Sequence, residues 1–212
     1  MWNRSEHQIK FILIRHGATE ANKEHRYLGK TDESLSAEGI EELQKEKCTG
    51  SYPPIDYLFA SPMKRCIETS KILYSDKEPI LIPEWKEMDF GVFEGKNYLD
   101  LQGDERYQAW FDSNGTLPFP EGESREAFIK RCEQGFYRML TQLSKQVLNQ
   151  NSDRKNPFIT IGLIVHGGTI MALLSSFCGG EYFDYQVVNG KGYICKLECT
   201  DESIRLDALE KI

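Results

Sequence analysis

The 212-residue sequence has no long apolar run, and none of its runs approaches the ~20 residues that a helix needs to cross a bilayer. The first eight residues, Met1 to Gln8, are polar with one Trp and lack the apolar core of a secretory signal. We therefore expect a cytoplasmic protein without a membrane segment.

Basic residues are in deficit, with 26 Lys and Arg against 33 Asp and Glu, which gives a formal net charge of −7. Proteins that hold nucleic acid through its phosphate backbone rely on clustered Lys and Arg. The composition therefore argues against a nucleic-acid partner, whereas a small anionic substrate would need only local positive charge.

Paired cysteines and closely spaced histidines are also missing. The six cysteines include no CxxC pair, and in a chain long enough for a substantial core their even number is poor evidence for disulfides. We expect them to be reduced, and we expect Cys66 and Cys132, which have apolar neighbours at helical positions, to fill space in the core. The four histidines form no HxH or HxxxH pattern, so their spacing indicates no metal site.

The chain does contain an alternation of apolar, strand-like runs and helical periods. Strands are predicted at 11–14, 55–60, 80–82, 158–165, 193–197 and 204–209, and helices at 37–47, 62–74, 98–111 with a break near Gly103, 125–148 and 169–177. Alternating strands and helices predict an α/β fold, a three-layer α/β/α sandwich with a mostly parallel central sheet and an antiparallel edge strand. No linker interrupts the pattern, so we expect a single domain over residues 1–212.

Three serines precede predicted helices and are placed to cap them: Ser36, Ser61 and Ser124. Polar or glycine-rich segments without a regular period are predicted to be loops or turns, at 22–33, 84–95, 114–122 and 149–157. The loop 84–95 packs four acids and three aromatics around two glycines, a composition that often carries function.

Two predicted strands end in the same way. The run 11–14 leads into Arg15-His16-Gly17, and the run 158–165 leads into His166-Gly167-Gly168. Because open α/β sheets keep their sites at the carboxyl ends of the strands, we expect His16 and His166 to emerge at one edge. The helix after the second strand carries Arg65 in its first turn, which places this arginine at the same edge.

These groups suit phosphoryl transfer. A neutral imidazole can attack phosphorus, and Arg15 and Arg65 can hold the phosphate oxygens. Glu87 or Asp89 could protonate the leaving alcohol and then deprotonate the water that cleaves a phosphohistidine. Zinc is the rival for two histidines near carboxylates, but Arg15 beside His16 would repel a cation, so we predict neither a metal nor a cofactor.

These residues belong to a longer series of motifs that runs along the chain. The series is Arg15-His16-Gly17 with Thr19 and Asn22, Tyr27-Leu28-Gly29 leading to Leu35-Ser36-Ala37-Glu38-Gly39, Ser61-Pro62-Met63-Lys64-Arg65 with Thr69, Glu87-Met88-Asp89-Phe90-Gly91 with Phe93-Glu94-Gly95, Gly122-Glu123-Ser124, and Val165-His166-Gly167-Gly168. From about Phe11 to Leu197 the sequence resembles the histidine phosphatase superfamily, the phosphoglycerate mutase-like group.

The resemblance implies a role for each site residue. It makes His16 the residue that is phosphorylated, and it makes Glu87 the acid and base. Arg15, Arg65 and His166 would form the phosphate pocket. Further phosphate or substrate contacts would come from Asn22 and from the backbone amides of Gly29 and Gly167.

The resemblance also separates branches of the family. Mutases typically carry two adjacent arginines after a Trp and a basic residue after the acid-bearing loop, but here Trp110 is followed by Phe111-Asp112, and Tyr98 stands at the basic position. The sequence is more similar to the α-ribazole phosphatase and broad-specificity phosphatase branch. This implies hydrolysis of a small phosphorylated metabolite, with α-ribazole 5'-phosphate among the candidates.

Several alternatives stay open. A cofactor-dependent phosphoglycerate mutase and a catalytically idle protein that binds phosphorylated ligands are the other functions considered. The oligomeric state is not predicted, and a homodimer is one option. The aromatics could line a pocket for an apolar or ring-bearing leaving group or could simply pack the core: Tyr27, Trp85, Phe90, Phe93 and Tyr98.

Overall fold

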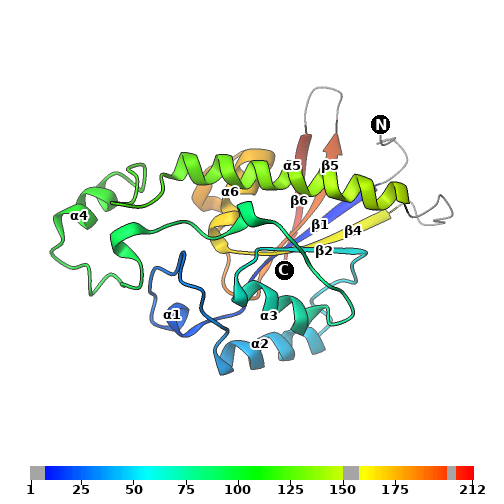
Figure 1. Ribbon diagram of the computed structural model, residues 1–212, viewed down its shortest axis with the longest axis horizontal. Coiled ribbons are helices and arrows are strands. Elements are labelled where there is room, and N and C mark those ends of the chain that lie inside the picture. Colours follow the sequence, from blue (N-terminus) through cyan, green and yellow to red (C-terminus); the bar gives the residue numbers. More distant parts are fainter. Residues whose placement is uncertain (1–7, 150–157, 200–203) are drawn as a thin grey trace.

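A six-stranded sheet runs through the centre of the computed structural model, which describes residues 8–149, 158–199 and 204–212 (Figure 1). The strands lie in the order β3-β2-β4-β1-β5-β6. They are β1 (Gln8–Arg15), β2 (Tyr57–Ala60), β3 (Ile80–Leu81), β4 (Phe158–Val165), β5 (Gly192–Cys199) and β6 (Ile204–Lys211). Each was predicted to within a few residues, and the part of the predicted turn at 150–157 lies outside the described residues.

Strand direction follows the prediction of a mostly parallel sheet. The four strands β3, β2, β4 and β1 are parallel, while β5 runs antiparallel to β1 and the edge strand β6 runs antiparallel to β5. In the register of β1 and β4, Arg15 pairs with Val165. The two strands therefore end level, and the residues that follow them meet at one edge of the sheet.

Helices cover both faces of the sheet. α2 (Ala37–Cys48) and α3 (Lys64–Leu73) lie on one face, and α5 (Arg125–Asn149) and α6 (Gly167–Cys178) lie on the other (Figure 1). Alternate side chains of β1 enter opposite cores: Phe11 and Leu13 on the α5 and α6 side, and Ile12 and Ile14 on the α2 and α3 side. Each fully buried side chain of this kind contributes about 1.5–3 kcal/mol, so the strand is held from both faces. The three-layer α/β/α prediction is confirmed.

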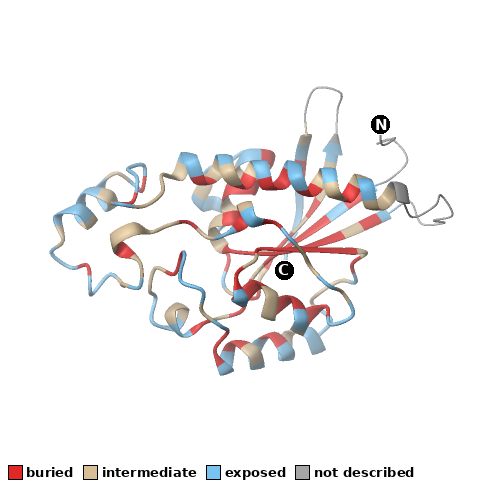
Figure 2. Cartoon of the chain, in the orientation of Figure 1, coloured by how far each residue is buried: buried red, intermediate tan, exposed pale blue. Residues whose placement is uncertain are grey.

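Burial is concentrated in the sheet and on the helix faces that meet it (Figure 2). Cys66 on α3 and Cys132 on α5 are both fully buried, one in each core, as predicted. No helix in the described part of the chain is long and apolar enough to cross a membrane.

Two of the three predicted serine caps are present. The Ser36 hydroxyl accepts the Gly39 amide at 3.0 Å, and the Ser124 hydroxyl accepts the Ala127 amide at 3.1 Å. The cap predicted at Ser61 is wrong, because α3 begins at Lys64 with Met63 as its N-cap residue. The Ser61 hydroxyl lies instead 2.8 Å from Nε2 of a buried histidine, His166, which has the greater need of a polar partner.

The loops contain short helices that the sequence did not indicate. α1 (Glu20–Lys23) begins behind the cap residue Thr19, and the 3₁₀ turns η1 (Pro83–Trp85) and η2 (Gly91–Phe93) lie in the predicted acidic loop. The break predicted near Gly103 within the helix 98–111 is confirmed, because Gly103 has φ +83°. Only the part after the break is an α-helix, α4 (Glu105–Asp112), with Asp104 as its cap. A further 3₁₀ turn, η3 (Tyr182–Tyr185), follows α6.

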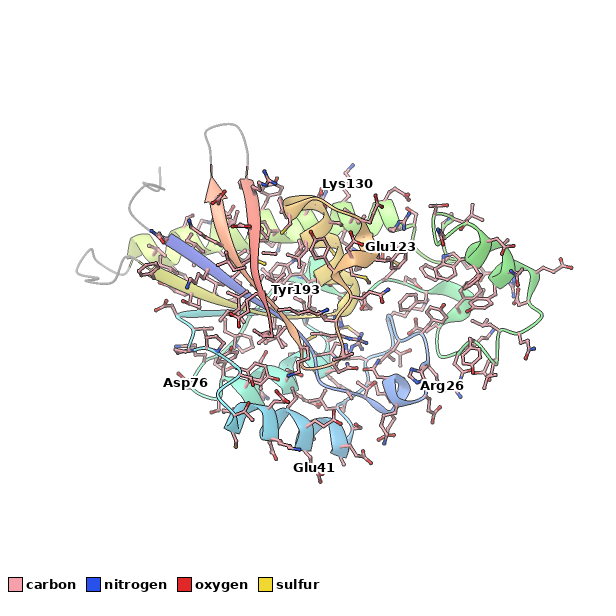
Figure 3. All side chains as sticks on the ribbon, turned by 180° about the vertical axis from the view of Figure 1, so that it is seen from behind. Arg26, Glu41, Asp76, Glu123, Lys130 and Tyr193 are labelled. Atoms are coloured by element: carbon pink, nitrogen blue, oxygen red, sulfur yellow. The ribbon has the colours of Figure 1, made fainter. Side chains whose placement is uncertain are left out.

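The segment around α4 extends beyond the N-terminal end of α5, away from the sheet (Figure 1). Arg26, beside α1 in Figure 3, ties this segment to the loop that follows β1. Its guanidinium donates to the Gly95 carbonyl at 2.8 Å and pairs with Asp100. The chain that precedes α4 is thereby held near the edge where β1 ends.

Candidate active site

His16 and His166 lie together where β1 and β4 end. Their ring centroids are 5.1 Å apart, the ring planes meet at 69°, and both side chains are buried. Two strands that are far apart in sequence thus deliver their histidines to a single site, as the sequence predicted.

The His16 imidazole is fixed in one tautomer. Its Nδ1 lies 2.7 Å from the Gly17 carbonyl, and since a carbonyl can only accept, Nδ1 carries the hydrogen. Burial, together with the positive charges of Arg65 and Arg15, holds the pKa of His16 well below its usual value. The ring is therefore neutral near pH 7, and Nε2 keeps its lone pair.

The His166 imidazole is held at both nitrogens. Nδ1 accepts from Arg65 Nε at 3.3 Å, so Nε2 carries the hydrogen and donates to the Ser61 hydroxyl at 2.8 Å. Burial and then the charge of Arg65 keep the pKa of His166 well below its usual value. To donate to a phosphate oxygen, this histidine would have to exchange its bond to Ser61.

Arg65 is fully buried and is held mainly by backbone carbonyls. Nη1 donates to Thr31 at 2.9 Å and Nη2 to Gly29 at 3.0 Å. These bonds fix the loop 28–31 over the site. Because carbonyls accept the hydrogen bonds without neutralising the charge, the positive field of this guanidinium remains in the site.

Arg15 ends β1 at the other side of the site. Its Nη1 donates to the Val187 carbonyl at 2.8 Å, whereas Nε is buried without a hydrogen-bond partner. Burial lowers the pKa of Arg15, opposed by the charge of Glu87. A Cβ at Gly167 would lie 3.4 Å from this Nε, so a residue without a side chain keeps the guanidinium accessible from α6. An anion is the ligand that would satisfy this arrangement.

Glu87 is the carboxyl group of the site. Its Oε1 accepts the Met88 amide at 2.9 Å and its Oε2 accepts the Gly168 amide at 3.4 Å. Burial raises the pKa of Glu87, although both amides and the nearby arginines oppose the shift. Asp89, the other candidate from the sequence, pairs with Lys30 at 3.3 Å near the surface, so Glu87 is the carboxyl that shares the environment of the histidines.

The loop that carries Glu87 is held by Arg131, which the sequence analysis missed. Its Nη1 donates to the carbonyls of Glu84 at 2.6 Å and Lys86 at 2.7 Å. Both carboxylate oxygens of Glu123, which is labelled in Figure 3, accept hydrogen bonds from the same guanidinium, at 2.9 Å and 2.7 Å. A charged residue in a helical period normally faces solvent, so nothing in the spacing indicated this role.

Asn22 is linked to the backbone of His16 through the side chain of Asn189. Its Oδ1 accepts from Asn189 Nδ2 at 3.0 Å, and the same Nδ2 lies 3.0 Å from the His16 carbonyl. Asn189 is a second residue that the sequence analysis missed, and it lies 173 positions beyond the histidine that it supports. With Oδ1 engaged, the Asn22 amino group is the part of the side chain that could reach a ligand.

The two predicted backbone donors differ in their surroundings. The Gly29 amide donates to both oxygens of Glu94, at 3.0 and 3.1 Å, so a phosphate would have to replace this carboxylate, and the contact stays a prediction; the Gly29 carbonyl meanwhile accepts from Arg65. Gly167 begins α6 behind its N-cap, His166. Amides in a first helical turn have no acceptor in their own helix, so a role for Gly167 in binding phosphate stays a prediction.

A cleft of about 560 Å³ leads to Glu87 past Lys30, Lys86 and Arg131. Within the described residues, no three His, Cys, Asp or Glu side chains are grouped as a metal site would require. The groups that face one another are two neutral imidazoles, two guanidiniums and one carboxyl of raised pKa.

Comparison with known proteins shows the family of the chain. The family model of the histidine phosphatase superfamily (branch 1) matches residues 11–211. The chain belongs to this superfamily. The adenosylcobalamin/alpha-ribazole phosphatase of Escherichia coli K12 is 32% identical over 176 residues, which cover 81% of this chain and 80% of that protein.

Two further similar proteins are a mutase and a phosphatase of known structure. A 2,3-bisphosphoglycerate-dependent phosphoglycerate mutase of Staphylococcus epidermidis is 29% identical, with 93% of this chain and 97% of that protein covered. The crystal structure of a putative alpha-ribazole-5'-P phosphatase from Escherichia coli superposes with a TM-score of 0.72 at 26% identity and covers 95% of each chain. The chain is thus similar both to phosphatases and to mutases.

Proposed function

We propose that this histidine phosphatase superfamily member is a metal-independent phosphomonoester hydrolase that works through a phosphohistidine at His16. The observation that carries the proposal is the tautomer of His16, because the Gly17 carbonyl takes the Nδ1 hydrogen and leaves the Nε2 lone pair for attack. The site's two guanidiniums and a carboxyl whose pKa is raised by burial provide what the remaining steps need.

The proposed reaction has two steps, phosphorylation of His16 and hydrolysis of the phosphohistidine. In the first, His16 Nε2 forms a bond to phosphorus, the ester P–O bond breaks, and Glu87 gives its proton to the departing oxygen. In the second, Glu87 takes a proton from water, the water oxygen attacks phosphorus, and the P–N bond breaks to release phosphate and the free imidazole. Arg15 and Arg65 stabilise the charge on the transferred oxygens in both steps.

The substrate we propose is a small phosphorylated metabolite. α-Ribazole 5'-phosphate is one candidate, since two of the relatives are named for alpha-ribazole phosphatase activity. The mutase alternative has its support in the Staphylococcus epidermidis relative. Against it, the chain has Phe111-Asp112 after Trp110 where the resemblance implies that mutases carry adjacent arginines.

Trapping the intermediate tests the proposal. The wild-type protein is mixed briefly with ³²P-labelled α-ribazole 5'-phosphate or p-nitrophenyl phosphate in EDTA, and the protein-bound label is then exposed to acid or base. We expect a label that acid removes and base does not, absent from His16→Ala and present in His25→Ala, whose histidine is exposed. Equal labelling of His16→Ala would refute the proposal, and 2,3-bisphosphoglycerate-dependent conversion of 3- to 2-phosphoglycerate would favour the mutase.

A further inference from the structure

A second cavity, of about 220 Å³, adjoins Glu87 on the side of α6 and α4. Most of its wall consists of aromatic rings and methionines, which are Tyr27, Phe90, Trp110, Phe119, Tyr182, Phe183, Met88 and Met171. We refer to these residues as the ring pocket. Because Glu87 lines it as well, the pocket lies on the side of the site from which a proton reaches the leaving group.

The walls of the ring pocket are built from rings that brace one another. Phe119 lies 5.0 Å from Phe90 and 4.8 Å from Trp110, centroid to centroid. Tyr182 and Phe183, also in the wall, are 5.2 Å apart, and the Arg125 guanidinium lies 5.7 and 5.8 Å from their centroids. Such offset and edge-to-face packing presents flat apolar surfaces, which favour another ring.

The hydroxyl groups of the two tyrosines in the ring pocket, Tyr27 and Tyr182, already have polar partners. The Tyr182 hydroxyl donates to the Gly168 carbonyl at 3.4 Å, and the Tyr27 hydroxyl interacts with Tyr107. Beyond Glu87, Arg125 and the Trp110 indole N–H, which is buried without a hydrogen-bond partner, the pocket has few groups that could pair with the several hydroxyl groups of a sugar or of glycerate. Buried hydroxyls without partners cost binding energy, so the pocket disfavours a polyol next to the phosphate, and among the candidate substrates it ranks the ribose ester α-ribazole 5'-phosphate below esters of apolar rings.

The size of the cavity limits the ligand. An apolar cavity of about 150 Å³ accommodates one benzene ring, so about 220 Å³ accommodates a ring with a short linker. We propose that the preferred leaving group is a flat apolar ring joined to the ester oxygen directly or through one or two carbons. The inference rests on the proposed function, because the same P–O bond breaks and Glu87 protonates the same oxygen.

Two alkyl esters isolate the contribution of the ring. Ethyl phosphate and 2-phenylethyl phosphate both release a primary alcohol, so a difference in kcat/KM reports binding of the ring and not the ease of departure. We expect the wild-type protein to prefer 2-phenylethyl phosphate by about 10- to 100-fold, the range for burying a phenyl-sized group. Ribose 5-phosphate is expected to behave like ethyl phosphate.

A matched pair of variants places the effect in the ring pocket. Phe183→Ala removes a pocket wall that is 45% exposed, and Phe111→Ala removes a phenylalanine that is 62% exposed and lies outside the pocket. Exposed positions of this kind leave the fold intact. Phe183→Ala is expected to reduce the ratio between the two esters by 3-fold or more, whereas Phe111→Ala leaves the ratio unchanged.

The possible outcomes separate the two proposals. Equal kcat/KM for the two esters, or a much higher value for ribose 5-phosphate or α-ribazole 5'-phosphate, overturns the inference and leaves the hydrolase proposal standing. An unchanged ratio in Phe183→Ala also overturns it. If no ester is turned over, p-nitrophenyl phosphate included, the proposed function fails and the inference fails with it.

Discussion

Glu87→Gln is the substitution that tests the acid-base chemistry most directly. It keeps the size of the side chain and one acceptor for the Met88 and Gly168 amides, but it removes the proton. One lost hydrogen bond costs about 1 kcal/mol of unfolding free energy. Loss of a general acid costs about 10²–10⁴ in rate, or ~2.7–5.4 kcal/mol of barrier, so the catalytic effect should far exceed the effect on stability.

The expected loss depends on the ester. An alkoxide leaves poorly without a proton, so kcat/KM for ethyl phosphate should fall by about 10²–10⁴. Nitrophenolate is a stable anion, so kcat/KM for p-nitrophenyl phosphate should fall by less than about tenfold, a residual effect of the altered hydrogen bonds. Because kcat/KM covers steps up to the first irreversible one, a slower hydrolysis of the phosphohistidine does not enter this comparison.

The same variant should also accumulate the intermediate. Without a base for the attacking water, p-nitrophenyl phosphate should give a burst of nitrophenol equal to the enzyme concentration, followed by a slow phase. In the wild-type protein kcat/KM for the alkyl ester should fall as pH rises through the raised pKa of Glu87, and Glu87→Gln should lack this limb. Equal losses on both esters, or an unchanged alkaline limb, would refute the role of Glu87 as acid.

Substitutions at three further positions test how the site is held. Arg131→Gln should lower kcat/KM by about tenfold or more for alkyl esters and by less for p-nitrophenyl phosphate, since Glu87 loses its anchor, and Arg131→Lys should not restore it. Gly168→Ala should reduce activity as Glu87→Gln does, because a Cβ would lie 2.5 Å from Glu87 Oε1. Ser61→Ala should lower unfolding free energy by about 1–3 kcal/mol in chemical denaturation, because Nε2 of buried His166 loses its acceptor; no change would show that the bond to Ser61 is dispensable.

The convergence of the two histidines could be predicted because it depends on local and topological information alone. A continuous apolar run encodes a strand buried on both faces, and two parallel strands that end level bring their following residues together. His16, His166 and Arg65 follow from this logic.

The features that could not be predicted concern groups whose partners lie far away in sequence. Ser61 has the local pattern of a helix cap, but its hydroxyl accepts a hydrogen bond from the buried imidazole of His166, 105 residues away. The Gly29 amide donates a hydrogen bond to the carboxylate of Glu94, 65 positions along the chain. Arg131 and Asn189 were missed for the same reason, because a helical period or a polar loop does not specify which distant carbonyl a side chain will meet.

The aromatic residues show how composition leaves a choice that only packing decides. Trp85 and Phe93 are fully buried in the core, Tyr27 and Phe90 line the ring pocket, and Tyr98 is 62% exposed outside it. Tyr27 comes from the loop after β1, and the other four come from the stretch of chain between β3 and α4. Their positions relative to α4 and η3, not their chemistry, separate core packing from a ligand pocket.

The electrostatics of the site have a common physical origin in burial. In a chain of formal net charge −7, Arg65 is buried against carbonyls and not against a carboxylate, so its charge stays available. Burial beside that charge disfavours a proton on His16, and burial disfavours an ionised Glu87. Both shifts widen the pH range in which a neutral imidazole faces a protonated carboxyl. This pair of states is what attack on phosphorus and departure of an alcohol require. Burial is the largest cause of both shifts, while the Arg65 charge adds to the lowering of the His16 pKa and opposes the raising of the Glu87 pKa.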